Sequence, residues 1–259
     1  AVCCAPNSLL SQKARDYQVP LKNVPIARKS LSGLWAMMGF LRQFQPDVVI
    51  THSSTDSWLV AVSRALQCNH EFALIRLRHV SAPIATDRFT RWLYHKANHV
   101  ITTSCAIAES VHHATGLPKT RISAIPTGVD IHHFRPVEIG LRLEARAALG
   151  IPLDAPCIGM VATLRSWKGH RFLIQALMEL PEAHVLIAGD GPQKEALHQL
   201  TVESCVSNRV HFLGHLEDPL PAFRAMDVFI QPSTANEGVS QSVLQAMACA
   251  LPVIVTDIG

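Results

Sequence analysis

The sequence is poor in charged and aromatic side chains, which make up 17% and 6% of its 259 residues. Hydrophobic residues make up 48%, enough to bury a sizeable core, so the composition excludes a disordered chain. The formal net charge of +3 is small, and we expect no nucleic-acid partner. No hydrophobic run approaches the roughly 20 residues that span a bilayer, which argues against a transmembrane helix.

Cysteine occurs seven times but never in a C-x-x-C pair, and the number is odd. This pattern argues against a disulfide framework and against a zinc site, so we expect a reducing, cytoplasmic compartment and no bound metal. The opening residues lack the features of a signal peptide and lead into a polar loop. The chain opens in an apparent strand and closes directly after another, so we expect a fragment that is incomplete at both termini.

Charge is unevenly distributed along the chain. Residues 1–135 contain 15 Lys and Arg against 7 Asp and Glu, whereas residues 136–259 contain 8 against 13. A basic half joined to an acidic half favours two domains with different partners, although drift in surface charge would give the same imbalance. A length of 259 residues suits one large domain or two ordinary ones.

Short β-rich runs alternate with helical patterns along the whole chain. This alternation predicts parallel sheets made of βαβ units, with ligands at the carboxyl ends of the strands. We expect two doubly wound α/β domains, residues 1–135 and 136–259, joined by a linker at 128–136. Strands are predicted at residues 47–51, 73–78, 99–104, 121–126, 157–162, 184–188, 210–213, 228–231 and 252–256.

Three strand-end loops of the second half carry candidate ligand-binding residues. The first holds Arg165 and Lys168 before a helix, where cations and unpaired N–H groups favour an anion. In the second, Gly191 allows close approach of the backbone to a ligand. In the third, Glu237 precedes a helix start, and the amides there can face a diphosphate. The amides belong to Gly238, Val239 and Ser240.

Simpler readings exist for each of these loops. The first can be a solvated basic loop, and the second can be an ordinary turn in which Gly-Pro marks the end of a strand. Glu237 can merely complement the dipole of the following helix.

The run EGVSQSVLQAMACALPVIVTD, at residues 237–257, resembles the signature of family 4 glycosyltransferases of the GT-B fold. Further stretches resemble the family in order: HVITTSCAIAESV, IPTGVDIHHFRP, LIAGDGPQKEAL and VHFLGHLEDPLPAFRAMDVFIQPS. The resemblance implies an acceptor-side Rossmann-like domain, residues 1–135, facing a donor-binding domain, residues 136–259, across a cleft. It also implies that the family's first strand and C-terminal tail are missing.

The resemblance implies a retaining transfer from a nucleoside diphosphate sugar, without a cofactor or a required metal. Glu237 would contact the sugar as a catalytic residue, and Gln245 would hold the ribose. His52, at the end of the strand at 47–51, matches the family's functional histidine and is the second catalytic candidate. The sequence departs from the family at two positions: Gln245 replaces a glutamate, and Thr163 replaces an arginine for which Arg165 would substitute.

The first half offers two weaker candidates. Arg76, Arg78 and His79 follow the strand at 73–78 and either line the acceptor side or form a solvated basic rim. The basic, amphipathic segment 26–44 contains Trp35 and either docks on an anionic membrane surface or packs on a sheet.

We therefore expect a cytoplasmic hexosyltransferase-like enzyme, peripheral on the inner membrane face, acting in lipopolysaccharide, polysaccharide or glycolipid synthesis. Its partners would be a nucleotide-sugar donor and a glycan or lipid-linked acceptor. Two alternatives remain: a nucleotide-sugar epimerase of the same fold, and a catalytically silent nucleotide-binding relative, which Gln245 and Thr163 would favour.

Overall fold

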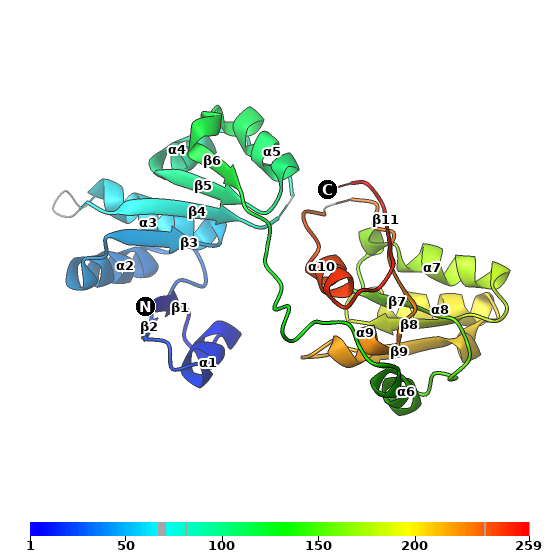
Figure 1. Cartoon of the computed structure of the whole chain (residues 1–259). Helices are drawn as coiled ribbons and strands as arrows, with labels where there is room; N and C mark the ends of the chain where they lie inside the picture. Colours follow the sequence, from blue (N-terminus) through cyan, green and yellow to red (C-terminus); the bar gives the residue numbers. More distant parts are fainter. Residues whose placement is uncertain (67–70, 81, 236, 259) are drawn as a thin grey trace. The chain divides into compact units, whose positions relative to one another are not determined.

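The chain divides into two compact units, Ala1–Pro126 and Thr127–Gly259, each with its own sheet (Figure 1). The segment 128–136, predicted as a linker, belongs to the second unit. The reason is Phe134, whose side chain is buried and packs edge-on against Phe223 in that unit's core. The computed structural model describes residues 1–66, 71–80, 82–235 and 237–258.

The main sheet of the first unit is parallel, with its strands in the order β3-β4-β5-β6. All four strands predicted for this half are present, with ends within two residues of the prediction. Their alternate residues, such as Leu74 and Val100, are buried in one hydrophobic core. The strands are β3 (Val48–Thr51), β4 (Ala73–Arg78), β5 (His99–Thr102) and β6 (Ile122–Ala124).

The polar segment after Cys4 is not the loop that the sequence predicts. It contains helix α1 (Leu9–Asp16), which begins where the Ser8 hydroxyl accepts a hydrogen bond from the Ser11 amide, 3.2 Å away. The chain then forms β2 (Leu21–Asn23), which pairs in parallel with β1 (Val2–Cys4). The β2 strand is fixed by this pairing rather than by any β-rich pattern of its own.

The described residues of the first unit also form α-helices α2 to α5. Helix α2 packs Leu34, Met37 and Leu41 into the core, so the apolar stripe predicted in segment 26–44 covers the sheet. Ser104 caps α5, since its hydroxyl accepts a hydrogen bond from the Ile107 amide at 3.2 Å. Among the described residues, no helix is long and apolar enough to cross a membrane. The helices are α2 (Leu31–Phe44), α3 (Ser54–Leu66), α4 (Arg88–Lys96) and α5 (Cys105–Thr115).

The second unit has a five-stranded parallel sheet in the order β11-β10-β7-β8-β9. The chain starts at the central β7, runs outward through β8 and β9, and returns to β10 and β11 on the other side. This doubly wound order places the topological switch point, where ligands bind in such sheets, between β7 and β10. The strands are β7 (Cys157–Val161), β8 (His184–Ala188), β9 (Val210–Gly214), β10 (Val228–Gln231) and β11 (Val253–Val255).

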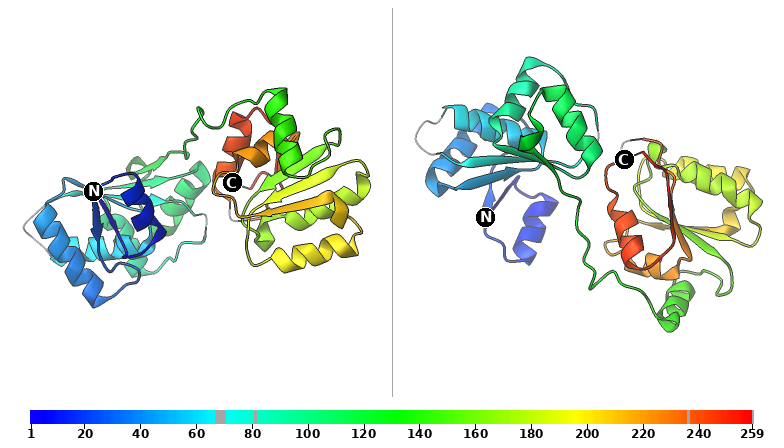
Figure 2. Two further views of the ribbon diagram at one scale, coloured as in Figure 1. Left: turned by 90° about the horizontal axis from the view of Figure 1, so that it is seen from below. Right: turned by 45° about the horizontal axis from the view of Figure 1, so that its top comes forward.

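Helices cover both faces of this sheet (Figures 1 and 2), with α7 and α8 on one face and α6, α9 and α10 on the other. Alternate residues of β8 explain the two layers: Val185 and Ile187 join the core beneath α7 and α8, whereas Leu186 and Ala188 join the opposite core. The helices are α6 (Ile139–Ala148), α7 (His170–Ala176), α8 (Lys194–Glu203), α9 (Leu220–Ala225) and α10 (Gln241–Ala248).

Candidate functional site

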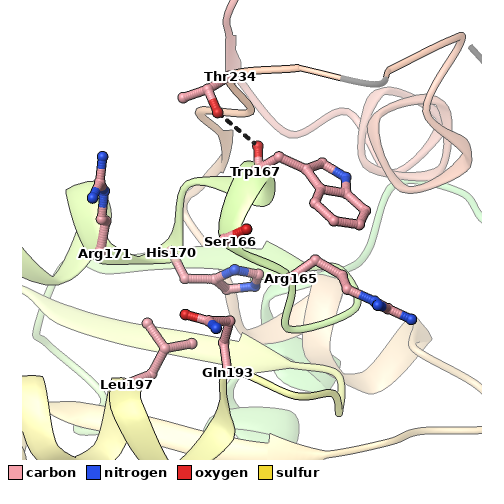
Figure 3. A pocket seen from close by; sticks show the side chains of 8 residues that line it. All are labelled: Arg165, Ser166, Trp167, His170, Arg171, Gln193, Leu197 and Thr234. Carbon is pink, nitrogen blue, oxygen red and sulfur yellow. Dashed lines mark hydrogen bonds between the residues drawn. The ribbon is translucent and has the colours of Figure 1, made fainter. Parts of the chain in front are cut away.

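The loops that follow β7 and β10 meet at the switch point of the second unit. The Thr234 amide donates a hydrogen bond to the Trp167 carbonyl at 2.7 Å, and the Thr234 hydroxyl lies 3.4 Å from the same oxygen (Figure 3). Gly169 makes this approach possible, since it adopts φ +84° and a Cβ there would lie 2.0 Å from the Pro232 oxygen. The contact therefore requires glycine at this position.

Lys168 and Glu237, both predicted at the donor site, form an ion pair across these two loops. The side chains are 17% and 11% exposed, so solvent screens the pair only in part. The Glu237 Oε1 atom also accepts a hydrogen bond of 2.7 Å from the hydroxyl of Ser233. Ser233 is 1% exposed, and its carbonyl accepts a hydrogen bond from the Thr256 hydroxyl. The carboxylate is thus held by a cation and by a buried hydroxyl.

The segment that leads from this ion pair into helix α10 has unpaired amides among the described residues. Ser240 occupies the N-cap position, but its hydroxyl donates to the Gln231 amide oxygen at 2.9 Å and does not cap the helix. Ser242 donates to the same oxygen at 3.1 Å. Within the described ranges, the amides of Gly238, Val239 and Ser240 have no hydrogen-bond acceptor. Unpaired amides at a helix start favour an anion.

The loop after β8 packs against the loop after β7. The Leu164 amide donates to the Asp190 carbonyl at 3.0 Å, and the Gln193 amide donates to the Leu164 carbonyl at 3.0 Å. Gly191 adopts φ +157°, and a Cβ there would lie 2.7 Å from the Leu164 oxygen. In this structure Gly191 is therefore required by loop packing, and its predicted contact with a ligand stays a prediction.

Arg165 lies on the loop after β7, beside Trp167. Its guanidinium is 5.6 Å from the centre of the Trp167 ring, and it lines a pocket of about 290 Å³ beside His170 and Gln193 (Figure 3). His170 is 2% exposed, and burial together with the Lys168 charge lowers its pKa to about 4. His170 is therefore neutral near pH 7. Arg165 and Lys168 lie on the same loop, and their predicted joint contact with a diphosphate stays a prediction.

Gln245 lies within α10, half-buried and eight residues beyond Glu237. Its side-chain amide makes no hydrogen bond to any described residue, which leaves both its donor and its acceptor available. The predicted contact of Gln245 with ribose has no further support in the structure and stays a prediction.

In the first unit, His52 follows β3 at the carboxyl end of the sheet, as predicted. Its backbone amide donates to the Asp56 carboxylate at 2.9 Å, and Asp56 also accepts the Ser53 amide at 2.8 Å. His52 Nδ1 lies 3.3 Å from His79 Nε2, and the two rings stack with an interplanar angle of 13°. The structure thus brings together two of the predicted residues from neighbouring strand ends, and both are exposed.

Arg76 and Arg78 differ from the solvated basic rim that is one reading of the sequence. Arg76 is 8% exposed, with its guanidinium 3.9 Å from the centre of the Tyr94 ring, and burial lowers its pKa. Arg78 donates to the Tyr94 hydroxyl at 3.3 Å and to the Ala82 carbonyl. Within the described residues, Arg76 Nη1 and Arg78 Nε are buried without hydrogen-bond partners.

Sequence reasoning missed three residues that organise these loops: Ser233, Gln231 and Asp56. Gln231 and Ser233 lie at or just beyond the end of β10, and Asp56 lies in the first turn of α3; these positions were the available signal. Their roles depend on partners brought together by folding. Within the described part of the chain, no group of three or more His, Cys, Asp and Glu side chains is placed to hold a metal ion.

Known proteins were compared with this chain at the levels of family, sequence and structure. A model of the family described as Glycosyltransferase Family 4 matches residues 2–133, and one described as Glycosyl transferases group 1 matches residues 155–259. The D-inositol 3-phosphate glycosyltransferase of Corynebacterium urealyticum is 35% identical over 174 residues, covering 62% of this chain and 40% of the relative. The 2-deoxystreptamine N-acetyl-D-glucosaminyltransferase of Streptomyces fradiae is 28% identical over 289 residues, covering 98% and 68%.

A third relative is the lipopolysaccharide core biosynthesis glycosyltransferase LpsE of Rhizobium meliloti, 35% identical over 111 residues, covering 43% of this chain and 32% of the relative. The chain thus spans between 32% and 68% of the length of these three relatives.

Solved structures confirm the predicted class of two Rossmann-like α/β domains. HepE of Anabaena, solved in complex with UDP-glucose, has a TM-score of 0.82 at 21% identity, covering 100% of this chain and 72% of that one. A glycosyltransferase from Rickettsia africae has a TM-score of 0.83 at 17% identity, covering 98% and 70%. The family model for residues 2–133 spans just over half of the sequence. The chain belongs to glycosyltransferase family 4.

Proposed function

We propose that this protein transfers a sugar from a nucleoside diphosphate sugar to an acceptor, with retention of configuration. The observation that carries the proposal is the Lys168–Glu237 ion pair beside the unpaired amides that open α10. One cation and several N–H groups suit a diphosphate, and one carboxylate suits sugar hydroxyls. The proposal is further supported by the solved complexes of HepE with UDP and with UDP-glucose.

The leaving diphosphate gains negative charge as the glycosidic bond breaks. Lys168 and the amides of Gly238 to Ser240 would stabilise that charge as a preorganised electrostatic site. Fixed N–H groups cost no reorganisation during the reaction, because the backbone of the switch-point loops already holds them. We propose on this ground that transfer needs no divalent metal and no other cofactor.

Two further residues have proposed roles in transfer. His52 would act as the catalytic residue of the first unit, and Asp56 would hold its backbone through the 2.9 Å hydrogen bond. Gln245 would bind the ribose with its free amide group. The acceptor would contact the first unit near Arg76, Arg78 and His79, where buried guanidinium nitrogens lack partners among the described residues. A glycan or lipid-linked acceptor with an anionic group fits that chemistry.

We also propose peripheral contact with the cytoplasmic face of a membrane. Leu31 and Trp35, one helical turn apart on α2, are 74% and 70% exposed, and exposed Arg42 follows two turns later. Arg28 and Lys29 precede the helix and are also exposed. An exposed tryptophan flanked by cations is typical of helices that bind anionic lipid surfaces. Vesicles that contain phosphatidylglycerol should retain the protein, and the Trp35→Ala variant should bind them less.

The activity is tested by incubating the protein with a panel of UDP-, GDP- and ADP-sugars, with and without chelator, and analysing the products. A new glycoside with retained configuration, formed in the presence of chelator, is the expected result. A changed donor sugar without transfer would favour the epimerase. Donor binding without turnover on any acceptor would favour the catalytically silent relative. Activity that chelator abolishes and magnesium or manganese restores would contradict metal independence.

A further inference from the structure

We propose that Ser233 is a positioning residue, which keeps the Glu237 carboxylate in place when Lys168 turns from Glu237 to the donor diphosphate. The inference rests on the proposed function. Its starting point is that both Lys168 and Ser233 bind the same oxygen, Oε1 of Glu237. Within the described residues, Oε2 has no partner, so one oxygen is held and the other is free for sugar hydroxyls.

Lys168 cannot be a permanent partner for Glu237 if it also binds the diphosphate. An ammonium on a flexible four-carbon side chain can rotate between two anions, and a diphosphate carries more charge than a carboxylate. Glu237 would then lose its positive partner when the donor is bound, which is when its carboxylate must be held in place to accept hydrogen bonds from the sugar hydroxyls. A carboxylate with one remaining fixed donor keeps its orientation, whereas a carboxylate with none would rotate.

Ser233 is suited to be that fixed donor. Its side chain is buried, and its hydroxyl donates only to Glu237 among the described residues. Its backbone is anchored on both sides, since its own carbonyl accepts the Thr256 hydroxyl and the next amide donates to Trp167. Ser233 follows β10 and Pro232, so the sheet fixes the position of its hydroxyl. This position does not depend on the conformation of the Lys168 side chain.

A double-mutant cycle in the ligand-free protein tests the contact. Ser233→Ala removes only a hydroxyl and should lower the unfolding temperature by a few degrees, since a hydrogen bond to a charged group is lost. In the Glu237→Ala background the same change should have almost no further effect. Equal losses in both backgrounds would overturn the proposal, because Ser233 would then stabilise the loop without acting through Glu237.

Turnover and nucleotide binding separate positioning from general loop damage. Ser233→Ala should lower kcat with the sugar donor at least about tenfold and change the Kd for free UDP by less than about twofold, because Lys168 and the α10 amides remain. Ser207→Ala is the matched control, since it removes a hydroxyl that donates to Thr201 of α8 and should retain activity. Unchanged kcat in Ser233→Ala, or a parallel loss of UDP affinity, would overturn the proposal.

These outcomes remain distinct from a failure of the proposed function. If no nucleoside diphosphate binds the wild-type protein, the donor-binding proposal fails, and with it the role of Ser233 in orienting Glu237 toward a sugar. If UDP binds and the sugar donor turns over but the Ser233→Ala profile is that of wild type, only the positioning role fails.

Discussion

The two units place their candidate residues at the same structural position but hold them in different ways. In both units the residues follow the carboxyl ends of parallel strands. In the second unit, the loops after β7, β8 and β10 are tied together by hydrogen bonds and by the Lys168–Glu237 ion pair. In the first unit, His52 and His79 contact each other, while two buried arginine nitrogens have no partner in the described part of the chain.

The difference indicates that the loops of the candidate site in the second unit are already held together by hydrogen bonds and an ion pair in the ligand-free protein. Within the described residues, however, the amides of Gly238 to Ser240, the Gln245 side chain and both buried ring nitrogens of His170 have no hydrogen-bond partner. Buried donors without partners, as at Arg76 and Arg78, cost free energy until something pairs with them. In the first unit the two unpaired nitrogens belong to arginines that we propose to lie near the acceptor.

The largest expected effect comes from breaking the partly buried ion pairs of Asp227 in the second unit. Asp227 binds Arg142, Arg146 and the Cys157 amide, and the Arg146 side chain is 2% exposed. Asp227→Ala should lower the free energy of unfolding by about 3 kcal/mol, because it leaves a buried guanidinium without its counter-charge. Urea denaturation measures this value.

The matched control lies in the first unit, where the exposed Glu109 pairs with Lys119. Glu109→Ala should not measurably change stability, because exposed ion pairs contribute little. A loss from Glu109→Ala equal to that from Asp227→Ala would show that the two units do not differ in the way described.

A smaller effect is expected at His52. His52→Ala should reduce turnover about 100-fold, the low end for removal of an acid–base or charge-stabilising side chain. The Kd for free UDP should stay within about twofold, because the diphosphate contacts belong to the second unit. Steady-state kinetics and calorimetry on the same preparation separate these quantities, and a His52→Ala enzyme with wild-type kcat would remove the residue from the reaction.

Within the second unit, the losses of UDP affinity in Lys168 and Arg165 variants show which of the two cations binds the diphosphate. Lys168→Ala should weaken UDP binding by about 1.5–3 kcal/mol, the range for hydrogen bonds to charged groups. Arg165→Ala should have a smaller effect, since its guanidinium lies 5.6 Å from the centre of the Trp167 ring, whereas Lys168 is the cation paired with Glu237. Calorimetry with UDP compares the two variants, and a larger loss from Arg165→Ala would reverse the assignment.

The smallest effect concerns pH. The folded pKa of His170 is about 4, below its ordinary value of 6.5, so folding opposes protonation. Between pH 6.5 and 4 the unfolded chain binds a proton that the folded chain does not, and stability falls as the pH falls. The loss between pH 7 and pH 5 should be about 2 kcal/mol. The lowered pKa values of His184 and His211 act in the same direction.

The variant His170→Leu removes the titrating ring and should show a shallower fall. Urea denaturation of wild type and variant at pH 7 and pH 5 measures both slopes. Parallel pH profiles for the two proteins would exclude His170 as a source of the acid sensitivity.

Most of the fold was predictable from short, apolar, β-rich runs bounded by turns. Strands β4, β8 and β10 have the predicted bounds. In contrast, β2 has the sequence Leu-Lys-Asn and exists because it pairs with β1, a contact that no local pattern reveals. Helix α1 exposes Leu9 and Leu10, so it lacks the buried stripe by which a helix is recognised.

The candidate site was predicted residue by residue, but its internal pairing was not. Lys168 and Glu237 were each placed beside a helix start from their strand-end positions. Their ion pair spans 69 residues of sequence and depends on β10 lying next to β7 in the sheet. Ser233 was missed for the same reason, since a serine after a strand has no assigned role until the carboxylate it binds is in place.

The central claim is that the second unit binds the diphosphate of a nucleotide-sugar donor at the start of α10. Titration of the ¹⁵N-labelled chain with UDP, GDP and ADP, followed by amide chemical shifts, tests this claim most directly. The account predicts saturable shifts of the Gly238, Val239, Ser240 and Lys168 amides with at least one of these nucleotides, and none at Leu200 in α8. Absence of shifts with all three, or shifts that cluster away from α10, would contradict it.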